Sequence, residues 1–406
     1  MTTSAPDERS DIEIGEQGID DVGRDLGALA LPMMLLRDSA LQHNVEAMAA
    51  YCAARGVLLS PHAKTTMSPQ ITARQLRAGA WGLTVANPQQ GRLARAFGAG
   101  RVLIANEVAD RTGLRWIAET LAGEAFELYC YVDSLAGIAL LDAALHTAGD
   151  RRLPVLVEVG FQGGRGGARS VDAAVAVAAA VGRSEHLRLA GIAGYEGTLR
   201  QQSDDDLPAA VRSFCREVVR AGSAMHAAGL LSDRPIASAG GSSWFDVVAA
   251  ELGRGWPIGV TPEVVLRSGC YVTHDHGVYA RTSPRSRGGD GPAFRPAIEV
   301  WANVVSRPEP NLALLDAGRR DLPFDDGLPV PLAVRGPQGT RSITGATVTR
   351  LNDQHAFCRI DADDPLAVGD VVVLGISHPC TAFDKWRRIP IVDDADRIVE
   401  IADTYF

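Results

Sequence analysis

Residues 153–160 read LPVLVEVG and residues 187–197 read LRLAGIAGYEG, with a stretch of helical spacing at 170–184 between them. Nearly continuous apolar runs of this kind are typical of parallel strands that are covered on both faces. The pattern predicts a strand–helix–strand unit with parallel strands.

This unit repeats along most of the chain between about residues 55 and 270. Six further apolar runs lie at 57–64, 81–87, 101–106, 126–133, 234–241 and 263–269. Helical spacing connects them at 69–79, 110–121, 134–149 and 204–229. Eight such units in a row favour a closed (β/α)8 barrel over an open doubly wound sheet.

After about residue 270 the pattern changes to short β-rich segments punctuated by turns, such as AIEVWANVVSRP and GDVVVLGIS. We therefore expect a disordered or extended segment over 1–28, the barrel over 29–271 and an all-β domain over 272–406. Residues 30–37 (ALPMMLLR) are expected to pair with the second domain.

Composition excludes several classes of protein. The net charge of -9 and the lack of a basic stripe argue against nucleic-acid binding. The sequence contains no run of about 18 uncharged apolar residues, so we expect no membrane span. The acidic N-terminus does not resemble a signal peptide. Six widely spaced cysteines form no disulfide framework. These features predict a protein of the reducing cytoplasm.

Lys64 in SPHAKTTMSP (60–69) is the first candidate for catalysis. Lysine occurs only at 64 and 385, although arginine is abundant. Lys64 follows the first predicted strand, at the barrel end where active sites gather. Partial desolvation there would free its amine as a nucleophile or base, as Schiff-base chemistry with pyridoxal phosphate requires. A lysine paired with a carboxylate at the barrel mouth is the alternative.

Three other strand ends carry polar or glycine-rich residues. SAGGSS (238–243) follows the seventh strand, where Gly240, Gly241 and Ser242 could hold a phosphate at a helix start. Arg165 lies in VEVGFQGGRGG and could bond an anionic oxygen, and Tyr195 in GYEGT could contact a planar ring. The alternatives are a plain turn, a loop arginine and a core tyrosine.

The segment HPC (378–380) contains a possible metal pair. His378 and Cys380 are two residues apart, and imidazole with thiolate suits Zn²⁺. A chance pair is the alternative. His355 in LNDQHAF is a further candidate, with a surface strand position as its alternative.

The motifs PHAKTT, VEVGFQGGRGG, GYEGT, AGGSS and ISHPC together resemble the fold type III pyridoxal-phosphate enzymes. Within them, the chain is similar over about residues 30–406 to the D-serine dehydratase and D-threonine aldolase group, which includes proteins described as D-serine deaminase-like. The barrel also resembles the alanine racemase N-terminal domain.

The resemblance implies a role for each motif. Lys64 would bind pyridoxal phosphate covalently, Arg165 would bond its phenolic oxygen, and Tyr195 would lie beside its ring. Gly240, Gly241 and Ser242 would hold the phosphate. The pair His378 and Cys380 would bind a divalent metal, with zinc favoured and manganese or magnesium as the alternatives. The resemblance also implies a homodimer.

Cys380 favours the dehydratases of this group, because the aldolases pair the histidine with aspartate. One departure matters, since both subgroups commonly read K-T-H where this chain reads Lys64, Thr65 and Thr66. That histidine has a base role in the aldolases, and His62 or His355 would have to replace it here.

These features predict β-elimination from 3-hydroxy-D-amino acids such as D-serine or D-threonine, giving a 2-oxo acid and ammonia. Retro-aldol cleavage to glycine and an aldehyde is the alternative. Racemisation needs no metal, and a non-catalytic cofactor carrier needs neither two domains nor the HPC pair.

Overall fold

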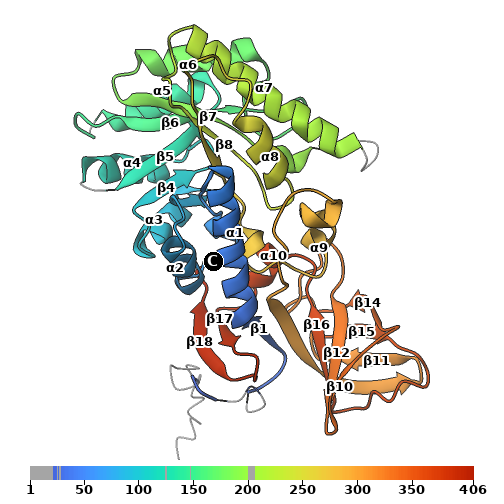
Figure 1. Ribbon diagram of the computed structural model, residues 1–406. Coiled ribbons are helices and arrows are strands. Elements are labelled where there is room, and N and C mark those ends of the chain that lie inside the picture. The colour runs from blue at the N-terminus through green and yellow to red at the C-terminus, as the bar shows by residue number, and fades with distance from the viewer. Residues whose placement is uncertain (1–21, 25, 27–28, 124–125, 147, 200–205) are drawn as a thin grey trace, which may run out of the picture.

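The chain folds into a parallel sheet surrounded by helices and a second sheet below it (Figure 1). The computed structural model describes residues 22–24, 26, 29–123, 126–146, 148–199 and 206–406. The segment predicted to be disordered or extended, 1–28, lies almost entirely outside these residues.

Eight parallel strands form the first sheet, in the order β2-β9-β8-β7-β6-β5-β4-β3. Their bounds are β2 Leu58–Leu59, β3 Leu83–Val85, β4 Arg101–Ile104, β5 Glu127–Val132, β6 Leu153–Val159, β7 Leu187–Gly194, β8 Ile236–Ala239 and β9 Glu263–Leu266. The helices are α1 Asp38–Arg55, α2 Pro69–Arg77, α3 Pro88–Ala96, α4 Arg111–Ala122, α5 Leu135–Leu145, α6 Val171–Arg183, α7 Leu207–Ala227 and α8 Phe245–Leu252. Each strand predicted from the apolar runs is present.

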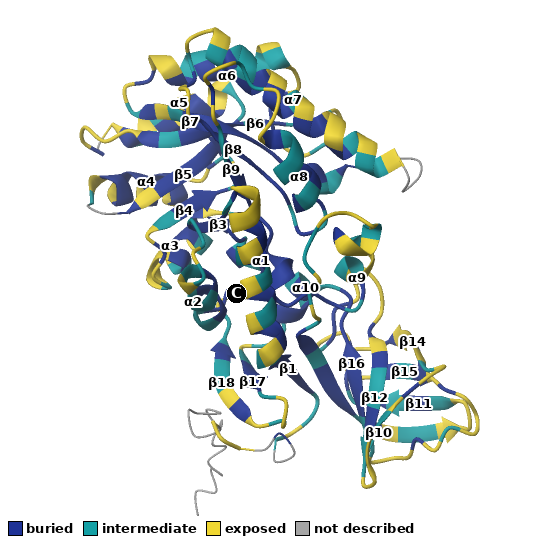
Figure 2. Cartoon of the chain, in the orientation of Figure 1, coloured by how far each residue is buried: buried dark blue, intermediate teal, exposed yellow. Residues whose placement is uncertain are grey.

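The sheet curls until its two edge strands meet. A parallel bridge joins His62 to Thr84, and the Trp81 N–H donates to the Leu59 carbonyl at 2.7 Å. The barrel strands are mainly buried, whereas the helices expose their outer faces (Figure 2). The (β/α)8 prediction is confirmed.

Side-chain caps start four of the helices that follow barrel strands. Asn87, Asp110, Ser134 and Ser170 each accept a hydrogen bond from the backbone N–H three residues later. Such caps satisfy N–H groups that have no partner within the helix. They lie at the carboxyl ends of the strands, the same end as the candidate site.

The second sheet has ten strands, ordered β13-β12-β16-β10-β1-β17-β18 along its main path. Off this path, β11 pairs with β10 and β15, and β14 pairs with β15. The bounds are β1 Met33–Arg37, β10 Ile298–Glu309, β11 Leu312–Leu315, β12 Val330–Gly336, β13 Gly339–Ser342, β14 Thr347–Leu351, β15 Ala356–Arg359, β16 Val371–Gly375, β17 Arg388–Val392 and β18 Ile398–Asp403. Two short helices, α9 Val278–Thr282 and α10 Pro379–Phe383, face the barrel.

The N-terminal strand β1 lies in this second sheet. It pairs with β10 through Met33 and Trp301 and with β17 through Leu36 and Ile391. The expected pairing of residues 30–37 is confirmed, although the predicted boundaries placed them with the barrel. The two statements differ because β1 precedes the barrel in the sequence but pairs with strands that follow it, and a single boundary along the chain cannot describe such a pairing.

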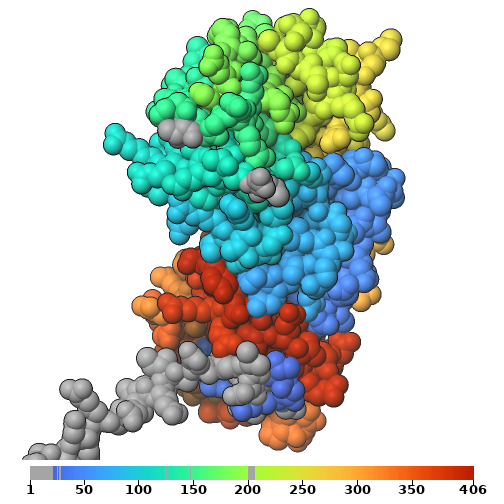
Figure 3. Space-filling model, turned by 90° about the vertical axis from the view of Figure 1, so that its left-hand side faces the viewer, coloured from blue at the N-terminus to red at the C-terminus, as the bar shows by residue number. Residues whose placement is uncertain are grey.

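The end of the chain packs directly against the first barrel unit (Figure 3). The Tyr405 N–H donates to the Met67 carbonyl at 3.0 Å, and Arg74 bridges Asp38 and Glu400. These contacts fix the segment that carries Lys64. Within the described part of the chain, no helix has the length and apolar character needed to cross a membrane.

Candidate active site

A cavity of about 750 Å³ opens at the carboxyl ends of the barrel strands. The side opposite the barrel is formed by residues of α9 and by the start of α10. Its lining includes most of the predicted site residues, namely His62, Lys64, Arg165, Tyr195, Gly241, Ser242, His378 and Cys380. The structure therefore brings together residues that span more than 300 positions of the chain.

Two predicted residues are missing from this lining, Gly240, whose loop is described below, and His355. His355 is exposed in the turn between β14 and β15 and does not line the cavity. Tyr271, His274, Asp275 and His276, which follow the last barrel strand, are also absent from the lining. In this chain, His62 is the predicted base that reaches the cavity.

Lys64 lies in a tight turn, Ala63–Thr65, separated from the end of β2 by three residues. His62 lies beside it, and its Nδ1 is buried with no hydrogen-bond partner among the described residues. Burial, together with the positive charges of Lys64, Arg267 and Arg165, holds the pKa of His62 well below its usual value. His62 is therefore a neutral imidazole at physiological pH.

Arg165 and Tyr195 lie against each other in the cavity. The guanidinium carbon of Arg165 is 4.9 Å from the centre of the Tyr195 ring, a cation–π distance. Burial raises the pKa of Tyr195 to about 12, so its hydroxyl stays protonated and available as a donor.

Arg267 is a cavity residue that sequence reasoning missed. It is 5% exposed, and its two terminal nitrogens donate to the Ser238 hydroxyl and the Gly194 carbonyl at 2.9 and 2.8 Å. Its signal was present in EVVLRSG (263–269), because a charge at the end of an apolar barrel strand points to the site. A fixed, buried cation of this kind suits an anionic ligand.

The glycine loop after β8 is arranged differently from the prediction. The Glu196 carboxylate accepts hydrogen bonds from the N–H groups of Gly240 and Gly241, at 3.1 and 2.7 Å. Gly240 has a φ of +93° and does not line the cavity. Gly241, Ser242 and Ser243 do line it, and the two serines are the residues of this loop that offer hydroxyl groups to the cavity.

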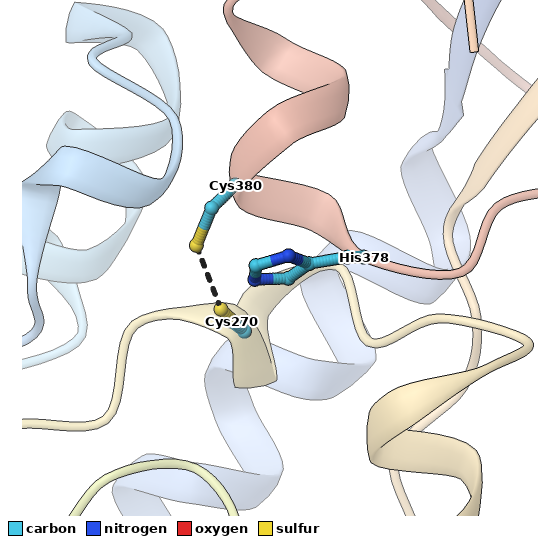
Figure 4. A group of neighbouring side chains, drawn as sticks. All are labelled: Cys270, His378 and Cys380. Carbon is cyan, nitrogen blue, oxygen red and sulfur yellow. Dashed lines mark hydrogen bonds between the residues drawn. The ribbon is translucent and has the colours of Figure 1, made fainter. Parts of the chain in front are cut away.

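Cys270, His378 and Cys380 form a compact cluster at the cavity wall (Figure 4). Their Sγ and ring-nitrogen atoms all lie within 4.8 Å of one another. The two sulfurs are 3.3 Å apart, and the Thr65 hydroxyl lies 3.5 and 3.6 Å from them. Sequence reasoning found the second and third members and missed Cys270, which follows β9.

Asp325 fixes the orientation of His378. The His378 Nδ1–H donates to Asp325 at 2.7 Å, and Thr381 donates to the other oxygen at 2.6 Å. Although burial opposes the charge, hydrogen bonds to Cys380 and Asp325 raise the pKa of His378 to about 9. Hydrogen bonds from Cys270 and His378 hold the pKa of Cys380 well below its usual value.

These residues fit both groups that the resemblance implies. Lys64, Arg165 and Arg267 offer an amine and two cations in a cavity of cofactor size, and His62, whose Nδ1 has no partner among the described residues, also lines it. Two thiols and an imidazole offer soft donors to a metal.

Comparison with known proteins agrees with this geometry. The family model for the alanine racemase N-terminal domain matches residues 37–245, and the model for the putative serine dehydratase domain matches 297–392. The chain belongs to the fold type III pyridoxal-phosphate enzymes. Within that class it belongs to the D-serine dehydratase and D-threonine aldolase group, and it is a pyridoxal-phosphate-dependent lyase.

Individual relatives match along most of their length. D-threonine aldolase from Arthrobacter sp. is 28% identical over 92% of this chain and 91% of its own. D-threo-3-hydroxyaspartate dehydratase from Delftia sp. is 29% identical over 74% of each chain. The crystal structure of D-threonine aldolase from Filomicrobium marinum superposes with a TM-score of 0.79, at 29% identity, over 94% of this chain and 97% of that one.

Proposed function

We propose that this protein catalyses β-elimination from 3-hydroxy-D-amino acids such as D-serine or D-threonine, giving a 2-oxo acid and ammonia. The observation that carries the proposal is the cluster around His378 and Cys380, which lines the same cavity as Lys64. Elimination needs a base at Cα and help for a poor leaving group at Cβ, and the cavity provides groups for both.

Lys64 is the base in this proposal. It would hold pyridoxal phosphate covalently, and its amine, once displaced by the substrate amine, would take the proton from Cα. Bound pyridoxal phosphate would supply an electron sink for the pair that this proton leaves behind. Arg165, Arg267 and Ser242 would hold the anionic groups of cofactor and substrate.

His378 and Cys380 would hold a divalent metal, most suitably zinc given these donors. The metal would supply Lewis acidity for departure of the β-hydroxyl. Asp325 would keep the imidazole in the ligating orientation through Nδ1, as carboxylates do in other histidine metal sites.

Retro-aldol cleavage is the second candidate, and the match to D-threonine aldolases over more than nine-tenths of the chain favours it. That reaction needs a base for the β-hydroxyl proton. The neutral imidazole of His62 could take that role, because burial and neighbouring cations keep it unprotonated. His355 lies outside the cavity of its own chain. As in the group the protein resembles, we expect a homodimer, which light scattering after size exclusion would detect.

Incubation of the purified protein with D-threonine, followed by NMR of the products, separates the two reactions. Elimination predicts 2-oxobutanoate and ammonia, and retro-aldol cleavage predicts glycine and acetaldehyde. L-threonine is the control for stereochemistry. Failure to convert either D-serine or D-threonine would contradict both candidates.

A further inference from the structure

Cys270 has no part in the function proposed above, although it lies in the metal cluster. It is 4% exposed and follows β9 in the turn Cys270–Val272. Its Sγ is 3.3 Å from that of Cys380, too far for a disulfide bond of about 2.05 Å. A free thiol is thus held beside the predicted ligands by a different part of the chain.

The spacing of the three donors fits a single metal ion. They lie within 4.8 Å of one another. In a tetrahedral zinc site, with Zn–S of about 2.3 Å and Zn–N of about 2.0 Å, ligand atoms are about 3.5 to 3.8 Å apart. The cluster needs only a small adjustment to reach these separations.

The contacts of this cluster with Asp325 and Thr65 are compatible with metal binding by its three donors. Asp325 takes the Nδ1–H of His378, so Nε2 is the ring nitrogen left for a metal. The Thr65 hydroxyl, 3.5 and 3.6 Å from the two sulfurs, can donate to either thiolate and ties the cluster to the segment of Lys64.

We propose that Cys270 is a third protein ligand, so that the metal site consists of two cysteines and one histidine with one position open to the cavity. The inference rests on the proposed function, because it concerns the same metal. Two thiolates make the site selective for zinc-like ions over Mn²⁺ and Mg²⁺. Three protein ligands with an open fourth position are the arrangement of catalytic zinc sites.

Cobalt(II) is the probe, because thiolate ligation gives a charge-transfer absorption that does not depend on activity. Metal-free protein carrying its cofactor is reduced and titrated with Co(II) without oxygen. Wild-type protein should show thiolate charge transfer with one Co(II) per chain. Cys270→Ala should lose about half of that absorption, because one of two thiolates is gone, and should bind Co(II) about 10-fold or more weakly.

Cys215→Ala is the matched control, because Cys215 is fully buried on α7, outside the cluster. It should leave the cobalt spectrum unchanged. Cys270→Ser serves as a second variant, and the cofactor absorption shows that each variant has folded.

An unchanged spectrum in Cys270→Ala, with complete loss in Cys380→Ala, would overturn the role of Cys270 and leave the proposed function standing. Absence of Co(II) binding to the wild type would overturn both.

Discussion

The two walls of the cavity differ in origin and in chemistry. The barrel wall carries Lys64, Arg165 and Arg267, each at the end of a different strand. The facing wall carries His378, Cys380 and Asp326, from α10 and the loop before β12. The first is rich in cations and suits an anionic cofactor, whereas the second offers soft donors and carboxylates and suits a metal. Substitutions should therefore separate cofactor binding from metal chemistry.

Loss of the barrel wall's amine should have the largest effect. Lys64→Ala should reduce turnover to background and abolish the absorption band of the lysine-bound cofactor, because no other lysine lines the cavity. Lys385→Ala removes the remaining lysine, which donates to the Arg319 carbonyl on the surface, and should retain both properties. Persistence of the absorption band in Lys64→Ala would refute the assignment.

Loss of a ligand on the facing wall should spare the cofactor. Cys380→Ala should keep the absorption of the bound cofactor and lose about 100-fold or more in turnover, since Lewis-acid stabilisation is worth several kcal/mol. Metal analysis and steady-state rates on the same sample test this. Near-normal turnover without bound metal would show that the two walls do not divide the chemistry in this way.

His274 and Asp275, in the segment between β9 and α9, should make the stability of the fold depend on pH. Burial lowers the pKa of His274 to about 4 and raises that of Asp275 to about 6. The unfolded chain holds the histidine proton from about pH 4 to 6.5, so His274 makes stability rise with pH in that window. The folded chain holds the Asp275 proton from about pH 4 to 6, so Asp275 makes stability fall.

The two contributions should largely cancel in the wild type. The measured quantity is the unfolding free energy at pH 6.5 minus that at pH 4.5. His274→Asn should make this difference more negative than in the wild type by roughly 2 kcal/mol, and Asp275→Asn should make it more positive by a similar amount. Urea unfolding at both pH values measures these changes. Shifts of the same sign in both variants would contradict the opposite titration of the pair.

The smallest effect is expected away from both walls. His355→Ala should change turnover by less than about 2-fold and the unfolding free energy by less than about 0.5 kcal/mol, because the side chain is exposed in a hairpin turn. Steady-state kinetics and thermal unfolding measure both. A large loss of turnover would show that His355 reaches a site of another chain.

The barrel wall was largely predictable, because apolar runs locate the strands and parallel strands all end at one edge. Lys64, Arg165 and Tyr195 could therefore be placed in one site from strand counting. The loop of Gly240 and Gly241 follows β8, the strand after which it was expected. Its N–H groups, however, donate to the carboxylate of Glu196, 44 and 45 residues away in the chain. No local pattern records that pairing.

The metal cluster and its surroundings were predictable only in part. HPC marked two donors, yet Cys270 lies 110 residues before Cys380 and has no motif of its own. Asp325, 53 residues before His378, was missed for the same reason.

The sequence by itself determined the eight-unit barrel, the change to β structure and the chemistry of the strand ends, since these depend on periodicity and on local residue types. Only the tertiary structure decided that the Glu196 carboxylate accepts hydrogen bonds from the N–H groups of the glycine loop and that a second sulfur joins the metal cluster. Those features depend on long-range packing, where distance in space bears no relation to distance along the chain.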